Sequence, residues 1–123
     1  MVIEKRFTIK NLDIIVVFIE LGYRCGYVGV PENNKYYKKD YNALNHIFKD
    51  GELTWSDFIP QFNPDLWYIG FDCGHYNQGV DISAYNAYFP GKELPASAIY
   101  LKGRPVTITE ACETCIKLAK LLM

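Results

Sequence analysis

The chain has 123 residues, 50% of them hydrophobic and 22% charged, which is typical of one globular domain over residues 1–123 and excludes a disordered chain. Its formal net charge of −1 gives no general attraction to nucleic acid, and its longest apolar run, residues 14–19, is too short to span a bilayer. The first residues contain no apolar signal segment, so we expect a cytoplasmic protein whose four cysteines are free thiols.

The beginning of the chain predicts three strands. Apolar and polar residues alternate over 2–10, which indicates a half-buried strand near the edge of a sheet. Residues 12–20 are apolar on both sides and predict a central strand, joined to the first by a hairpin. Residues 24–30 predict a third strand, which Pro31 ends because proline lacks a backbone donor. In the first strand, the side chains expected to be buried are Ile3, Phe7 and Ile9.

The middle of the chain is less regular. Asp40 is expected to cap a short helix over residues 41–48. A brief extended piece over 53–56 and a loop over 57–65 follow. Residues 76–98 are aromatic and poorly periodic, so we expect a long loop there, a feature that is uncommon in compact domains and often functional.

Residues 66–75 predict a strand that runs into a turn, and they hold the densest reactive chemistry of the chain. Successive side chains of a strand point to opposite faces, so one face carries a bulky apolar set and the other ends at Asp72. Gly70 leaves a gap on this second face, which favours close approach by another group. The apolar set, expected to face the main core, is Trp67, Ile69, Phe71 and Cys73.

The end of the chain predicts an amphipathic helix. Thr107 and Glu110 have the spacing of a capping box at its start. Glu113 and Lys117 are spaced as a favourable i, i+4 pair on the polar side. The apolar stripe comprises Ile108, Ala111, Cys112, Cys115, Ala119 and Leu122. Because free cysteine is often buried, we interpret the two cysteines of this stripe as core residues rather than as half of a zinc site.

Cys73 and His75 are the best candidates for catalysis or metal binding. A cysteine beside a histidine base is suited to nucleophilic catalysis, provided that the two are within hydrogen-bond reach. With Cys25 and Asp81, the same pair would supply ligands for zinc. The alternative is that Cys73 belongs to the core and His75 hydrogen-bonds the turn. We predict no cofactor and keep zinc as the open alternative.

Arg24 and Asp72 are expected to form a structural ion pair. Each precedes a Cys-Gly dipeptide, so equal offsets in two paired strands would place both side chains on one face. A bidentate pair of this kind would order the turn that holds His75.

Tyrosine is unusually frequent, with ten residues in the chain. Tyrosine is enriched at binding surfaces, which favours a protein as the partner over nucleic acid. The lysine- and tyrosine-bearing loop over 33–39 has the residue types that stack bases, but the net charge gives no support for that role. The candidate binding residues are Tyr36, Tyr37, Tyr76, Tyr85 and Tyr88. The sequence leaves the oligomeric state open.

Three stretches of the sequence resemble a group of small bacteriophage and prophage proteins. These proteins share the runs Gly-x-Arg-Cys-Gly-Tyr-Val, Leu-Thr-aromatic and Trp-x-x-Gly-Phe-Asp-Cys-x-His. In this chain the three runs stand in that order within residues 22–31, 53–55 and 67–75. The resemblance implies a phage origin and does not imply a reaction.

Together these patterns predict an α+β domain with a mostly antiparallel sheet of four to five strands. The C-terminal helix is expected to pack on one face of the sheet, with one short helix nearby. For function we hypothesise a non-catalytic phage accessory protein that binds a host or phage macromolecule, in the role of an inhibitor of host defence. The alternative is a small metal-binding protein or enzyme centred on Cys73 and His75.

Overall fold

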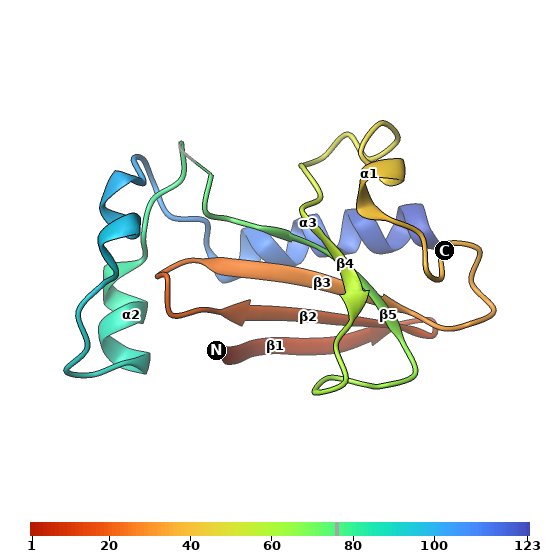
Figure 1. Ribbon diagram of the computed structural model, residues 1–123, viewed down its shortest axis with the longest axis horizontal. Helices are drawn as coiled ribbons and strands as arrows, with labels where there is room; N and C mark the ends of the chain where they lie inside the picture. The colour runs from red at the N-terminus through yellow and green to blue at the C-terminus, as the bar shows by residue number, and fades with distance from the viewer. Residues whose placement is uncertain (76) are drawn as a thin grey trace.

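The computed structural model describes all residues except Tyr76, together with all side chains except those of Tyr76 and Ile99. Five antiparallel strands form one sheet in the order β1-β2-β3-β5-β4, and helix α3 packs across one face of it (Figure 1). The strands are β1 (Val2–Ile9), β2 (Leu12–Phe18), β3 (Arg24–Val30), β4 (Trp55–Phe58) and β5 (Trp67–Asp72). The helices are α1 (Tyr41–Leu44), α2 (Ile82–Tyr88), the short 3₁₀ helix η1 (Ala96–Tyr100) and α3 (Ile108–Leu122). The predicted α+β architecture is therefore confirmed.

Strand β2 lies in the interior of the sheet, between β1 and β3, as its apolar residues of both parities predict. All seven of its side chains are buried. Lys10 supplies the left-handed residue of the tight β1–β2 turn, with φ 56°. The two edges of the sheet are β1 and the short strand β4.

A bulge in β1 changes which side chains are buried. The pairing shifts between Ile3, opposite Val17, and Lys5, opposite Val16, so that Glu4 is the extra residue. The side chain of Glu4 is consequently only 1% exposed, whereas Ile3 is 46% exposed. The prediction that Ile3 is buried was wrong, because an inserted residue moves the residues before it to the other face.

The main core lies between the sheet and α3. Its aliphatic side chains come from alternate positions of the inner strands, including Ile14, Val16, Val28 and Ile69. Gly26 of β3 permits the close approach of the helix, since a Cβ there would lie 2.6 Å from the Cys115 sulfur. Phe71 and Cys73 also lie in this core, as the alternation of residues 66–75 predicts.

Helix α3 begins as predicted. The Thr107 side chain accepts a hydrogen bond from the Glu110 backbone N–H, and the Glu110 side chain accepts one from the Thr107 backbone N–H. Cys115 is fully buried in the core, whereas Cys112 is only half-buried. Lys117 was expected to pair with Glu113. The ion pair that it forms is instead with Asp50, where its Nζ atom lies 3.7 Å from Oδ1. All four cysteines are free thiols.

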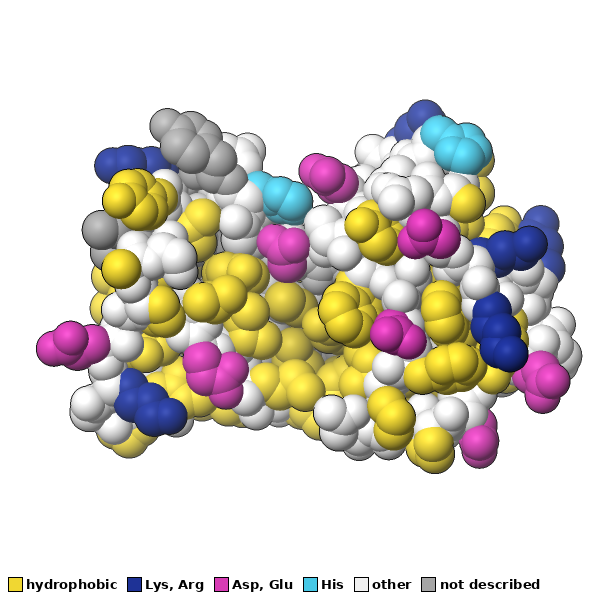
Figure 2. All heavy atoms as spheres, in the orientation of Figure 1, with side chains coloured by type: hydrophobic (Ala, Val, Ile, Leu, Met, Phe, Trp, Pro, Cys, Tyr) yellow, Lys and Arg dark blue, Asp and Glu magenta, His cyan; other side chains and the backbone are white. Residues whose placement is uncertain are grey.

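Among the described residues, no helix packs across the other face of the sheet, which is called here the open face. Because directly opposed residues in antiparallel strands share a face, the register assigns Ile3, Val17, Tyr27, Trp55, Asp57, Tyr68, Gly70 and Asp72 to it. Its own side chains form a second, smaller core around Ile15, Val17, Cys25 and Tyr68. Figure 2 shows a hollow lined by hydrophobic side chains on this side of the molecule, between two raised parts.

Two of the smaller elements differ from the sequence-based expectations. Helix α1 is a single turn, and its first amide, that of Tyr41, donates to the Ser56 hydroxyl rather than to Asp40. The Asp40 side chain accepts from the Ser56 hydroxyl and makes no capping hydrogen bond to the helix, so the prediction that Asp40 caps it was wrong. Strand β4 extends to Phe58, into residues where a loop was expected.

The expected long loop over 76–98 contains helix α2 and the start of η1. Asp81 caps α2, since its side chain accepts from the Ala84 backbone N–H. Two ring contacts attach this helix to the end of the sheet, where Phe18 lies 5.4 Å from the Tyr88 ring and 6.3 Å from the Phe89 ring. Within the described residues, no helix is both long and apolar enough to cross a membrane.

Candidate functional site

A buried arginine ties three distant parts of the chain together. Arg24 donates to both carboxylate oxygens of Glu4, at 2.7 and 3.1 Å, and to Asp81 at 2.8 Å. It also donates to the backbone oxygen of Val106, just before α3. Tyr88 completes the network by donating to Glu4 at 2.7 Å. This arginine network therefore attaches α2 and the entry to α3 to the sheet.

The ionisation of the network follows from these contacts. Burial alone would lower the pKa of Arg24, but its hydrogen bonds to Glu4 and Asp81 outweigh that effect and raise it. Burial alone would raise the pKa of Asp81, but the Ala84 amide and Arg24 outweigh it and hold the pKa below its usual value. Both groups are therefore charged at neutral pH.

The predicted pair between Arg24 and Asp72 was wrong. The register places Asp72 opposite Cys25, on the open face. Arg24 is one residue away, so its side chain points to the α3 face. Asp72 instead accepts from the backbone N–H of Gly74 at 2.9 Å and orders the turn without an arginine.

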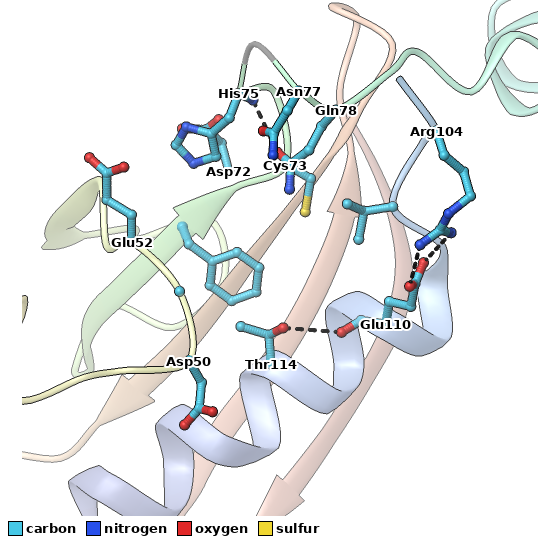
Figure 3. A pocket seen from close by; sticks show the side chains of 13 residues that line it. Asp50, Glu52, Asp72, Cys73, His75, Asn77, Gln78, Arg104, Glu110 and Thr114 are labelled. Carbon is cyan, nitrogen blue, oxygen red and sulfur yellow. Dashed lines mark hydrogen bonds and ion pairs between the residues drawn. The ribbon is translucent and has the colours of Figure 1, made fainter. Parts of the chain in front are cut away.

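A cleft of about 910 Å³ opens where β5 ends. One wall comes from residues 50–52, and the back comes from Arg104 and the first turns of α3 (Figure 3). The residues of the other wall are Asp72, Cys73, His75, Asn77 and Gln78. Phe71, Cys73 and Val106 supply apolar lining. Asp72 lines this cleft, and the register also assigns it to the open face.

The cleft is acidic. The positive charge of Arg104 is compensated by Glu110, which accepts two hydrogen bonds from it at 2.8 and 2.7 Å. This bond and the Thr107 amide lower the pKa of Glu110 to about 2. Glu52 and Asp72 have no basic partner among the described residues. The lining therefore carries a surplus of negative charge.

Cys73 and His75 both line the cleft but are not arranged as a catalytic pair. In Figure 3 the Cys73 sulfur points toward α3, whereas the His75 imidazole points away from it. Cys73 is 3% exposed, and burial together with Asp72 raises the pKa of its thiol to about 12. At neutral pH the thiol is protonated and is not the thiolate that nucleophilic catalysis requires.

The four candidate metal ligands do not converge. Cys25 lies in the small core of the open face and Cys73 in the core beneath α3, so the sheet separates them. Asp81 is bound to Arg24, and the His75 backbone N–H donates to the Gln78 side chain. Among the described residues, no three His, Cys, Asp or Glu side chains are placed to share a metal ion.

The candidate tyrosines do not form one surface. Tyr85 is buried and donates to the Glu93 backbone oxygen, and Tyr88 belongs to the arginine network. Tyr36 packs against the main core from the loop after β3. Tyr37 packs edge-on against Phe58 and lines a smaller groove of about 540 Å³. Tyr76 lies outside the described residues.

The aromatic residues that do gather lie on the open face. Tyr23 and Tyr27 flank Cys25, and the Tyr27 ring covers Gly70, where a Cβ would lie 2.5 Å from its Cδ1 atom. Trp55 stands directly opposite Gly70 and is 44% exposed. The gap at Gly70 and the parity of Tyr27 were visible in the sequence, but the position of Trp55 depends on the β4–β5 pairing, which was not.

No protein-family model, curated protein or solved structure matches this chain.

Proposed function

We propose that this protein is a non-catalytic module that holds a protein partner on its open face. The carrying observation is the apolar open face, which is hollowed in Figure 2 and whose two edge strands, β1 and β4, leave Ile3 and Trp55 46% and 44% exposed. An exposed apolar surface with charged groups at its rim is typical of interaction sites. On the other face of the same sheet, α3 packs over β1, β2 and β3, so the two faces differ in how much apolar surface is left exposed.

A protein fits this surface better than a nucleic acid does. The open face carries Asp57 and Asp72, whose charge repels phosphates. The lysines that the sequence offered for phosphate contact lie elsewhere, with Lys35 and Lys38 placed 5.0 and 5.9 Å from the rings of Tyr36 and Tyr37. Large aromatic side chains such as Trp55 are instead typical anchors of protein interfaces.

The resemblance to phage proteins supports a host or phage protein as the partner, met in the bacterial cytoplasm. A host-defence protein held on the open face would be kept from its own target, which is how a small module without catalytic chemistry would inhibit it. The alternative function, a Cys73–His75 enzyme, is disfavoured because the thiol is buried and protonated.

The proposal is tested by capture from bacterial lysate with matched variants. The test variant is Ile3→Ser with Trp55→Ser, and the control is Ile47→Ser, an exposed apolar residue (40%) that follows α1. A protein retained by the wild type and the control, and bound at least about tenfold more weakly by the test variant after purification, supports the proposal.

Two results contradict it. In the first, every retained protein binds the test variant as tightly as the wild type. In the second, light scattering shows that the protein is a dimer that the test variant disrupts, because the hollow would then be covered by a second copy of the chain.

A further inference from the structure

We infer that the open face recognises a protein segment in which an apolar side chain lies between two basic ones. This inference rests on the proposed function and specifies the chemistry of the partner. The apolar side chain would contact Trp55 and Tyr27, and the basic side chains would pair with Asp57 and Asp72.

The register sets the geometry of this site. Asp57 stands opposite Tyr68, Trp55 stands opposite Gly70, and Asp72 is two residues further along β5. These positions share the open face, since they are spaced by two residues. The rows of Tyr68 and Asp72 are separated by about 13 Å, at about 3.3 Å per residue. The aromatic contact therefore lies midway between two carboxylates.

The two carboxylates are available to a partner. Asp57 accepts from the Phe58 backbone N–H at 2.7 Å, and Asp72 accepts from that of Gly74 at 2.9 Å, each through Oδ1 only. A carboxylate accepts several hydrogen bonds, so both keep capacity for a cation.

The chain offers no spare arginine for them. Arg6 pairs with Asp13, Arg24 with Glu4 and Asp81, and Arg104 with Glu110. No basic residue of the described chain forms an ion pair with Asp57 or Asp72. A cation brought by a partner would therefore meet unpaired acids rather than compete with an internal arginine.

The cleft favours a long basic side chain at the Asp72 end. Asp72 lines this cleft, which holds about 910 Å³ and carries Glu52 on another wall. Its apolar lining from Phe71 and Val106 suits the aliphatic stem of an arginine or a lysine, while the acidic rim suits the charged end.

The middle of the site is aromatic. The Tyr27 ring lies over Gly70 because glycine leaves the sheet without a side chain there. Trp55 rises next to it from the edge strand. Contact with an apolar side chain would bury part of this aromatic surface, and the rings also attract the flanking cations.

The test is selection of a displayed random-peptide library on the purified wild-type protein. We expect enriched peptides to combine an aromatic or aliphatic residue with lysine or arginine on both sides. Binding of a selected peptide should weaken about fivefold in Asp57→Asn and about fivefold in Asp72→Asn, and it should weaken with added salt. Glu113→Gln, on the outer side of α3, is the control and should bind as the wild type does.

The outcomes separate the two proposals. Peptides that lack basic residues, or that bind both asparagine variants like the wild type, overturn the inference and leave the proposed function intact if they are lost with Ile3→Ser and Trp55→Ser. Peptides that bind this double variant unchanged contradict both proposals. Failure to enrich any peptide overturns the inference that a linear segment is recognised.

Discussion

The two faces of the sheet are covered by different means. On one face α3 lies over aliphatic side chains, and the glycine at position 26 allows the helix backbone to approach. On the open face the sheet is covered by aromatic rings, including Phe62 of the β4–β5 loop, which lies 5.5 Å from the Tyr68 ring. A polar network also lies there, in which Asp13 accepts from Arg6 at 2.9 Å and from Tyr68 at 2.7 Å.

This difference separates stability from recognition. Complete burial of side chains under α3 contributes to folding and leaves those side chains out of a partner's reach, whereas partial burial on the open face leaves apolar area for a partner. If this account holds, substitutions beneath α3 should change the free energy of unfolding, and substitutions at the exposed positions of the open face should change binding.

The largest loss of stability is expected at Arg24, which attaches α2 and the entry to α3 to the sheet. Arg24→Met should destabilise the fold by about 3–5 kcal/mol, because it leaves the buried carboxylate of Glu4 without its cation. Asp72→Asn, on the open face of the neighbouring strand, should cost less than about 1 kcal/mol, since asparagine still accepts a hydrogen bond from the Gly74 amide. Urea unfolding of both variants measures the difference.

The double variant sharpens this prediction. Arg24 and Asp72 share no partner, so their effects should add, whereas Arg24→Met and Asp81→Asn should lose less together than the sum of the two. Strong coupling between Arg24 and Asp72 would contradict the separation of the two side chains by the sheet.

Within the main core, Leu118→Ala should destabilise by about 2–5 kcal/mol, because Leu118 is fully buried and its removal leaves a cavity. Trp55→Ala removes a larger side chain from the open face, yet it should change stability by no more than about 0.5 kcal/mol. If thermal unfolding ranked the two substitutions in the opposite order, this would contradict the claim that burial under α3 contributes more to stability than the exposed side chains of the open face.

The polar network of the open face should contribute less than the main core. Tyr68→Phe removes the hydroxyl that donates to Asp13 and should cost about 1–2 kcal/mol. Tyr37→Phe is the matched control, since that hydroxyl donates to Asp65 only at 3.4 Å and in an exposed position, and it should be nearly neutral. Denaturant unfolding of both variants tests the contrast, and equal losses would argue against a structural role for the network.

The smallest effect concerns the start of α3. The pKa of Glu110 is lowered to about 2 from 4.5 by Arg104 and the Thr107 amide, so its stabilising contribution is present above 4.5 and is lost as the pH falls toward 2. Glu110→Gln should therefore remove part of the acid-induced loss of stability in this window. Urea midpoints at a series of pH values measure it, and parallel curves for the two proteins would be evidence against this role.

The sequence predicted the elements whose pattern is local. Period-2 alternation identified β1, β3 and β5, a run that is apolar on both faces identified β2, and Thr107 with Glu110 identified the start of α3. Both depend on residues a few positions apart, and the structure confirms them. The face of Tyr27 and the gap at Gly70 were predictable for the same reason.

Features that depend on distant residues were not predictable. Arg24 has its partners 20, 57 and 82 residues away, and one of them, Glu4, faces it only because of the bulge. Helix α2 is seven residues long and has no clear apolar stripe. Its position depends on packing against Phe18, which is distant in sequence. Trp55 was assigned to no surface because neither strand's own sequence predicts that β4 pairs with β5.

The most direct test of the central claim is hydrogen–deuterium exchange of the protein with and without its captured partner. The account predicts that the partner slows exchange of residues 23–27, 55–58 and 68–74, around the open face, and leaves the outer side of α3 unchanged. Protection confined to α3 or to the groove near Tyr37, with no change around Trp55, would contradict it.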